Sequence, residues 1–377
     1  MTSVVLFGTS SFIRLVLKKR LSMHNDLHIL GDFIPTDEDG LHLIAEKKPQ
    51  IILFDLDVPS LKGLEMVQSI IKIHPNCAVI VLLNLSIGGA EVALKALEIG
   101  AVDFIHKESS VLEIDLHAFE NALLAKIKQW SNYLSSLAGT FRIFSEPNTK
   151  PSLHAELNPR NLNVPTPVIN PTWEASYTIP KKNAKKINLV LIGVSTGGPL
   201  TLLNMLSKIK KKLNCPIVIA QHMPPAFTKS LSSHLQVETS LNIVEGNHAL
   251  LLEPGMIAIA RGGIDSKIQR VSSNQFMLVE KKNVITGIHP SVDFLFTSAS
   301  TLACEILAII LTGMGSDGLD GVRKLYYQGA TIVAQNPDTC VVNGMPLSII
   351  HAGYVHHILN PELVGELINE WCTDSDN

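Results

Sequence analysis

A run of prolines between residues 147 and 180 constrains the fold of this 377-residue chain more than any other feature. Its seven prolines, interleaved with Asn, Ser and Thr, can continue neither a helix nor a central strand, because proline lacks an N–H donor. The basic cluster 181–186 that follows is typical of a solvated hinge. We therefore predict a first domain over residues 1–130, a linker over 131–186 and a second domain over 187–377.

Composition excludes several classes of protein. Hydrophobic residues make up 46% of the chain and charged residues 17%, which is unlike a disordered chain. A net charge of −3 creates no positive field for nucleic acid or an anionic membrane, and no apolar run is long enough to span a bilayer. The N-terminus lacks the basic start of a signal peptide. The five widely spaced cysteines favour reduced thiols over a zinc site or a disulfide framework, so we expect a cytoplasmic protein with no membrane insertion.

Short apolar runs alternate with stretches of helical spacing in both predicted domains. Fully apolar runs of this length are typical of buried parallel strands, and two α/β sheets with helices on both faces follow from the alternation. In the first domain we expect a five-stranded, flavodoxin-like sheet with strands at residues 4–7, 27–30, 51–54, 78–83 and 102–105. In the second we expect a doubly wound, mainly parallel sheet with strands at 187–193, 216–220, 256–260, 306–311 and 331–334.

The segment Gly193-Val-Ser195-Thr-Gly197 follows a predicted strand and opens a predicted helix. It fits the G-x-S-x-G pattern, in which glycines allow a tight turn that exposes a serine hydroxyl at the sheet edge. Free N–H groups at the start of the helix favour developing negative charge there. A loop that only turns the chain or binds a phosphate is the alternative, although the lysine of a P-loop is missing. Ser195 is therefore the candidate nucleophile.

A serine nucleophile requires a base that takes its proton. His222 directly follows the strand predicted at 216–220, so it lies at the same sheet edge as Ser195. Three other histidines are less well placed for this role: His289, His356 and His357.

The base requires an acid that orients it, and Asp317 follows the strand predicted at 306–311. Asp293 and Asp320 remain alternatives, and Asp317 could also act as a helix N-cap. The order Ser…His…Asp differs from the Ser…Asp…His order of α/β-hydrolases, which disfavours that fold.

Six motifs in this order resemble the chemotaxis protein-glutamate methylesterase family, and the first domain resembles the response-regulator receiver that precedes the catalytic domain in that family. The resemblance covers almost the whole chain outside the linker. Its motifs are Gly193-Val-Ser-Thr-Gly-Gly-Pro, Gln221-His-Met-Pro-Pro-Ala-Phe-Thr, Glu253-Pro-Gly, Pro290-Ser-Val-Asp-Phe-Leu-Phe, Leu311-Thr-Gly-Met-Gly-Ser-Asp-Gly and Gly344-Met-Pro.

The resemblance implies hydrolysis of glutamate γ-methyl esters on chemoreceptors, with release of methanol, and deamidation of receptor glutamines. It also implies methyl-accepting chemotaxis receptors and a chemotaxis histidine kinase as partners, with neither a metal nor a cofactor in catalysis. Ser195 matches the nucleophile, His222 the base and Asp317 the orienting acid, while Thr196 and Met314 match positions near the oxyanion.

Two departures from the family pattern stand out, one in each domain. In the catalytic part, Arg261 replaces a proline in an otherwise matching loop. In the receiver, Asp55 matches the phosphoacceptor and Lys107 the lysine after the fifth strand, but Gly8 and Thr9 replace the two acids that hold Mg²⁺. Further differences there are Leu83 or Asn84 in place of the hydroxyl residue, Glu108 in place of a proline, and an additional carboxylate at Asp57. The resemblance thus implies a degenerate receiver that is not conventionally phosphorylated, with Mg²⁺ binding in question.

Two other functions compete with a protein esterase. One is a non-catalytic scaffold that keeps a pseudo-receiver and docks on signalling partners. The other is an esterase for small molecules. The complete set of Ser195, His222 and Asp317 favours the protein esterase.

Overall fold

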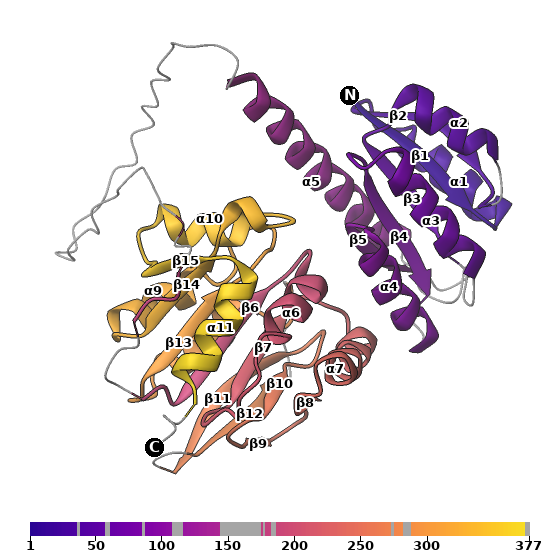
Figure 1. The fold of residues 1–377 in the computed structure, drawn as a ribbon. Coiled ribbons are helices and arrows are strands. Elements are labelled where there is room, and N and C mark those ends of the chain that lie inside the picture. The colour runs from indigo at the N-terminus through magenta and orange to yellow at the C-terminus, as the bar shows by residue number, and fades with distance from the viewer. Residues whose placement is uncertain are drawn as a thin grey trace.

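The computed structural model describes residues 1–35, 38–56, 61–84, 87–107, 116–143, 175, 178–181, 186–272, 275–281 and 288–373. Two α/β units, each built around its own parallel sheet, make up this part of the chain (Figure 1). The predicted fold class is confirmed for both. Most of the predicted linker, including six of its seven prolines, lies outside the described residues, so the predicted boundaries at 130 and 186 stay predictions.

The first unit is a five-stranded sheet in the order β2-β1-β3-β4-β5, with every neighbouring pair parallel. All five residues of β3 are buried, as expected for a central strand covered on both faces. The strands are β1 (Thr2–Gly8), β2 (Leu27–Phe33), β3 (Ile51–Asp55), β4 (Ala78–Asn84) and β5 (Asp103–Lys107).

Alternate strand residues point to opposite faces of this sheet, so its helices divide into two layers. On one face Leu6 and Leu53 pack with Leu17 and Ile127 of α1 and α5. On the other face the core includes residues of α2, α3 and α4. The helices are α1 (Ser11–Leu21), α2 (Glu38–Lys47), α3 (Leu61–Ile73), α4 (Ile87–Ile99) and α5 (Leu116–Ile143).

The second unit has a seven-stranded, fully parallel sheet in the order β15-β14-β13-β6-β7-β10-β8. An additional antiparallel sheet, β11-β12-β9, packs beside it and was not predicted. The strands are β6 (Leu189–Val194), β7 (Ile217–Gln221), β8 (Ile243–Glu245), β9 (Leu250–Leu252), β10 (Ile257–Ile259), β11 (Asp265–Ser272), β12 (Gln275–Lys281), β13 (Ile306–Ile310), β14 (Thr331–Gln335) and β15 (His357–Leu359).

Helices cover both faces of the large sheet. Helices α6, α7 and α11 share one core cluster with it, and α8, α9 and α10 share the other with the small sheet. Their bounds are α6 (Gly198–Leu206), α7 (Pro225–Thr239), α8 (Val292–Ala299), α9 (Leu319–Tyr327), α10 (Gly344–His351) and α11 (Pro361–Trp371), and a 3₁₀ turn spans Pro337–Thr339.

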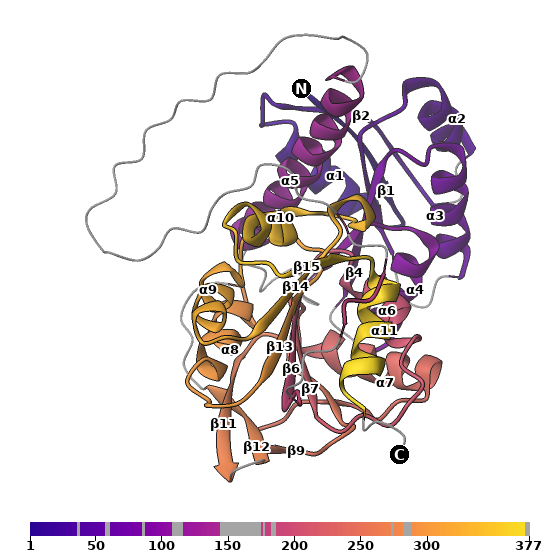
Figure 2. The ribbon, with the colours of Figure 1, turned by 60° about the vertical axis from the view of Figure 1, so that its left-hand side comes forward.

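The two units pack against each other through α4 and β5 on one side and α6 and α7 on the other (Figure 2). The rings of Phe104 and Phe227 stack with centroids 4.5 Å apart, and His234 Nε2 lies 2.7 Å from Glu98 Oε1. One hydrophobic cluster joins buried residues of both units. Within the described ranges, no helix combines the length and the apolar character needed to cross a membrane.

Candidate active site

Ser195 directly follows β6, and two neighbouring strand ends hold its backbone. Its N–H donates to Thr312 O at 3.0 Å, and the Gln221 side-chain amide donates to Ser195 O at 2.9 Å. Gly197, two residues after Ser195, is the N-cap of α6. Its φ of +78° is a conformation that glycine adopts readily. The turn that presents Ser195 therefore depends on both β7 and the loop after β13.

Close packing against Ser195 explains why position 313, in the motif after β13, is a glycine. A Cβ on Gly313 would lie 2.8 Å from Ser195 Cβ and 2.3 Å from Met345 Sδ, which is too close for either contact. Gly313 thus lets the loop after β13 approach the serine directly. This approach brings the loop that carries Asp317 to the same sheet edge as Ser195.

His222 directly follows β7, and its backbone N–H donates to Val194 O at 3.1 Å beside the serine. The imidazole is almost buried, with 6% of the side chain exposed, and its Nε2 lies 2.7 Å from Asp317 Oδ2. A carboxylate only accepts hydrogen bonds, so Nε2 carries the proton in this pair. When the ring is neutral, Nδ1 therefore has the free lone pair.

Asp317 accepts four hydrogen bonds. Besides His222, the N–H groups of Val292 and Asp293 donate at 2.7 and 2.9 Å, and the Ser291 hydroxyl donates at 3.1 Å. Ser291 is the N-cap of α8, so Asp317 lies at the positive end of that helix. Burial raises the pKa of Asp317, but the hydrogen bonds from His222 and Asp293 outweigh it and lower the pKa to about 2.

The alternative acids contact other groups. Asp293 Oδ1 accepts from Gly321 N at 2.7 Å, and burial, followed by the charges of Asp317 and Asp320, raises its pKa to about 6. Asp320 is exposed and pairs with Arg323 at 2.9 Å. Neither hydrogen-bonds to His222, so among the three candidates only Asp317 orients its ring.

The alternative histidines also have other partners. His289 Nδ1 lies 2.9 Å from Asp265 Oδ1. His356 stacks on Tyr326 and accepts from Ile332 N, while His357 packs edge-on against Trp371. Burial lowers the pKa of both His356 and His357. Among the described residues, none of the three is hydrogen-bonded to Ser195 or to Asp317.

The two residues expected near the oxyanion lie on the loops that meet at Ser195. Thr196 O accepts from the Thr312 hydroxyl at 2.9 Å. The Met314 N–H makes no hydrogen bond within the described part of the chain, so it is available to a developing oxyanion. Among the same residues, the Ser195 hydroxyl and the His222 ring are not hydrogen-bonded to each other, as is common in enzymes without bound substrate.

Comparison with known proteins shows which family the chain belongs to. Residues 190–368 match the family model for CheB methylesterase, and residues 9–118 match the model for the response regulator receiver domain. The protein-glutamate methylesterase/protein-glutamine glutaminase of Thermotoga maritima is 32% identical over 370 residues, which cover 97% of this chain and 98% of that protein. The chain belongs to this methylesterase family.

Further relatives of the methylesterase family give the same picture. The protein-glutamate methylesterase/protein-glutamine glutaminase 1 of Oleidesulfovibrio alaskensis is 32% identical, with 98% of each chain covered. The crystal structure of the Thermotoga maritima CheB methylesterase catalytic domain matches with a TM-score of 0.47 at 35% identity, over 49% of this chain and 98% of that one. The response regulator domain of Thermotoga maritima CheB matches with a TM-score of 0.31 at 31% identity, over 35% and 97%.

Two groups that help to build the candidate site were not identified from the sequence. Asp265, at the start of β11, accepts from His289 and from Ser291 N at 2.8 Å. Ser291 in turn donates its hydroxyl to Asp317, so both residues position the candidate acid. The available signal was the serine before the apolar run 292–296, which is typical of a helix N-cap.

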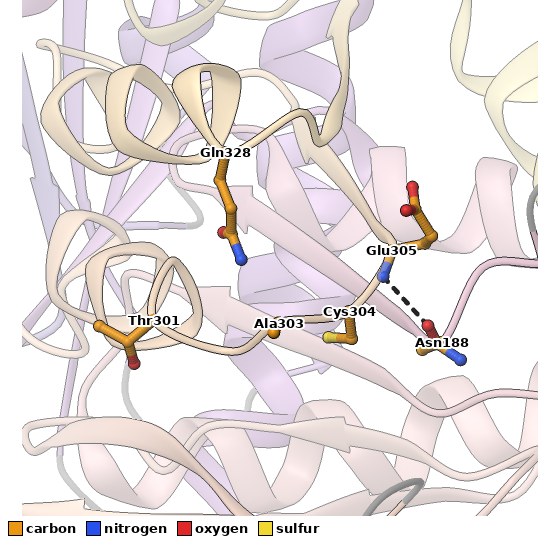
Figure 3. A pocket seen from close by; sticks show the side chains of 6 residues that line it. All are labelled: Asn188, Thr301, Ala303, Cys304, Glu305 and Gln328. Atoms are coloured by element: carbon orange, nitrogen blue, oxygen red, sulfur yellow. Dashed lines mark hydrogen bonds between the residues drawn. The ribbon is translucent and has the colours of Figure 1, made fainter.

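A pocket elsewhere in the methylesterase unit lies at the opposite edge of the large sheet (Figure 3). Its residues come before β6, β13 and β14, whereas Ser195 and Asp317 come after β6 and β13. Asn188 accepts a hydrogen bond from Glu305 N at 3.0 Å within it. The pocket is therefore separate from the candidate site.

The receiver of this methylesterase holds Asp55 at the end of β3 in a buried ion pair with Lys107 at the end of β5. The side chains are 1% and 8% exposed. Asn84 is the register partner of Lys107 and lies at the same edge. Asp57 and Glu108 lie outside the described residues, and no group of three acidic, histidine or cysteine side chains among the described ones could hold a metal ion.

Hydrophobic contacts connect the receiver with the loops of the candidate site. Val342 belongs to the same cluster as Ile127 and Trp130 of α5, and Met314 and Val341 pack against this cluster. Met314 therefore lies next to the receiver, and it directly follows Gly313, which packs against Ser195.

Proposed function

We propose that this protein hydrolyses glutamate γ-methyl esters on methyl-accepting chemotaxis receptors through Ser195, His222 and Asp317. The observation that carries the proposal is the 2.7 Å hydrogen bond between His222 and Asp317, formed at the strand edge where Ser195 lies partly exposed. Family membership over nearly the full chain supports the substrate class. The close set of three residues supports a serine mechanism.

In the first half of the reaction, Ser195 Oγ attacks the ester carbonyl and its proton passes to His222 Nδ1. Asp317 accepts from Nε2 and stabilises the imidazolium, and its lowered pKa keeps it ionised at neutral pH. The Met314 N–H donates to the oxyanion of the tetrahedral intermediate. When the intermediate collapses, His222 protonates the leaving methoxide, which departs as methanol, and an acyl-enzyme remains.

In the second half, His222 takes a proton from water, and the resulting hydroxide attacks the acyl-enzyme. Collapse of this intermediate returns the proton to Ser195 and releases the glutamate carboxylate. The same steps on a glutamine side chain release ammonia in place of methanol, so deamidation requires no additional group. Neither half requires a metal or an organic cofactor.

The receiver, in this proposal, acts as a cover for the catalytic unit and is not conventionally phosphorylated by a chemotaxis histidine kinase. The contact of Met314 and Val341 with the receiver cluster supports its role as a cover. Gly8 and Thr9, at the end of β1, provide no carboxylate for Mg²⁺, which supports the absence of conventional phosphorylation.

Methanol release from methylated receptor membranes tests the proposed activity. Wild-type protein should release methanol, and Ser195→Ala should not. Activity on small free esters but not on receptor membranes would favour the small-molecule esterase. Inactivity of both the full-length chain and a fragment of residues 181–377 on either substrate would favour the non-catalytic scaffold.

A further inference from the structure

The surroundings of Asp55 differ from a metal site in more than the loss of two acids. Gly8 ends β1 and is the register partner of Asp55. The Cβ that Gly8 lacks would lie 3.1 Å from Asp55 Cβ, 3.2 Å from Asp55 Oδ2 and 3.3 Å from Arg14 Cγ. The Arg14 side chain and the Asp55 carboxylate therefore meet over Gly8, in the space that an acidic side chain at position 8 would occupy.

Arg14 is held in this place by several contacts. It lies in the first turn of α1, and its Nη1 donates to the carbonyl oxygens of Gly8 and Thr9. Its Nε lies 3.9 Å from Asp32 Oδ2, and only 16% of the side chain is exposed. The guanidinium is thus fixed at the end of β1.

Lys107 is the ion-pair partner of Asp55. Its Nζ donates to Asp55 Oδ1, and the pair is nearly buried. Mg²⁺ requires oxygen ligands in near-octahedral geometry and is usually held through one or two carboxylates. Here Gly8 and Thr9 provide no carboxylate, and the Arg14 side chain, which lies in the space beside Gly8, carries a positive charge that repels a divalent cation. The described residues therefore do not fit Mg²⁺.

We propose that Arg14 replaces the divalent cation of this receiver. Its side chain occupies the space beside Asp55 while Lys107 stays paired with that carboxylate, so the domain holds one conformation whether or not Mg²⁺ is present. The receiver then cannot use a metal-dependent phosphodonor, and it packs on the catalytic unit as a constant cover. This inference deepens the proposed role of the receiver and is independent of the proposed esterase activity.

Titration of the full-length chain with Mg²⁺ tests the replacement directly. Wild-type protein should show no saturable binding that depends on Asp55, as judged against Asp55→Ala. The double variant T9D/R14S should gain such binding, at least about tenfold tighter than wild type, because one carboxylate is added and one cation removed. The matched control is Arg20→Ser, on the same helix, whose Nη1 lies 3.3 Å from Glu120 Oε2, and it should behave as wild type.

The inference would be overturned if the wild type bound Mg²⁺ in an Asp55-dependent way and with the same affinity as the double variant. If that binding occurs without phosphorylation by a small-molecule phosphodonor, the metal replacement fails while the proposed unphosphorylated receiver stands. Stoichiometric phosphorylation of wild type, lost in Asp55→Ala, would overturn both.

Thermal unfolding gives a second measurement that does not require the double variant to fold. Asp55→Ala should lower the unfolding midpoint of the full-length chain, because it leaves buried Lys107 without its carboxylate. In a site of crowded carboxylates the same change would relieve repulsion. An unchanged or higher midpoint for Asp55→Ala, or a wild-type midpoint raised by Mg²⁺ in an Asp55-dependent way, would contradict the replacement.

Discussion

Asp317 and Asp55 both lie at the carboxyl edge of a parallel sheet, but their neighbours are of different kinds. Asp317 receives hydrogen bonds from two backbone N–H groups, a hydroxyl and an imidazole. Asp55 pairs with the ammonium of Lys107, with Arg14 beside it. Only the imidazole can accept and return a proton near neutral pH.

The difference shows how the same sheet edge can serve chemistry or structure. Neutral donors keep Asp317 ionised and leave one side of its partner histidine for a substrate. The ammonium of Lys107 pairs with Asp55, and the Arg14 side chain occupies the space beside it. The predictions below test this contrast between a reactive carboxylate and a structural one.

The largest effect should follow from loss of the nucleophile. Ser195→Ala should lower the rate of methanol release by on the order of 10⁶, because one missing member disables a triad that acts as a unit. His222→Gln should be nearly as severe. Initial rates on receptor membranes measure both, with circular dichroism as a check on folding. Substantial residual turnover in Ser195→Ala would rule out this serine as the nucleophile.

Replacement of the orienting acid should have the next largest effect. Asp317→Asn should lower the rate by on the order of 10⁴, because an amide stabilises the wrong histidine tautomer. Asp293→Asn is the matched control, since Asp293 contacts Gly321 and not His222. A wild-type rate for Asp317→Asn together with an inactive Asp293→Asn would show that the acid is assigned incorrectly.

Removal of the receiver should raise the rate. The fragment 181–377 should remain folded and exceed the full-length chain by about tenfold, within the usual range of coupling between sites, because Met314 and Val341 lose their receiver contacts. The proline-rich segment should also be the first site of limited proteolysis. Equal rates for fragment and full-length chain would argue against a covering role.

The lowered pKa of Asp317 should appear in acid unfolding. Since its folded pKa of about 2 lies below the usual value near 3.9, its contribution of about 2 kcal/mol is complete above pH 5 and is lost as the pH falls towards 2. Denaturant unfolding of the fragment against pH measures this. In Asp317→Asn the slope of stability between pH 5 and 2 should be smaller, and an unchanged slope would refute the linkage.

The raised pKa of Asp293 should act in the opposite direction. A folded pKa of about 6 means that the folded state binds a proton more readily than the unfolded chain. Stability should therefore increase as the pH falls from about 7 to 4, before the loss due to Asp317 dominates. Asp293→Asn should remove this increase, and its persistence in that variant would assign it to another group.

The smallest effect should come from the ion pair at the domain interface. His234→Ala removes the contact with Glu98, whose side chain is 40% exposed, and such pairs contribute at most about 1 kcal/mol. The rate of the full-length chain should rise by no more than about fivefold, while the fragment should be unaffected. A similar change in both forms would place the role of His234 within the catalytic unit.

Both sheets could be predicted from the sequence because buried parallel strands are nearly continuous apolar runs. The five receiver strands and the central strands of the second sheet were recognised in this way, and their carboxyl ends identified Ser195, His222 and Asp317 as candidates. The small sheet β11-β12-β9 was not predicted. Its longest strand, β11 (Asp265–Ser272), is partly exposed and mostly polar, so its pattern resembles a loop.

Tertiary structure alone decided which groups surround each carboxylate. Two of the hydrogen bonds to Asp317 come from the backbone N–H groups of Val292 and Asp293, which are distant in sequence and carry no sequence signature. Arg14 and Asp55 are also distant in sequence, so only the folded sheet brings them together beside Gly8. The sequence by itself determined which reactive side chains lie at the ends of the strands, because hydrophobic periodicity and composition govern strand formation. The charged groups that surround each of these side chains depend instead on how the helices and strands pack together.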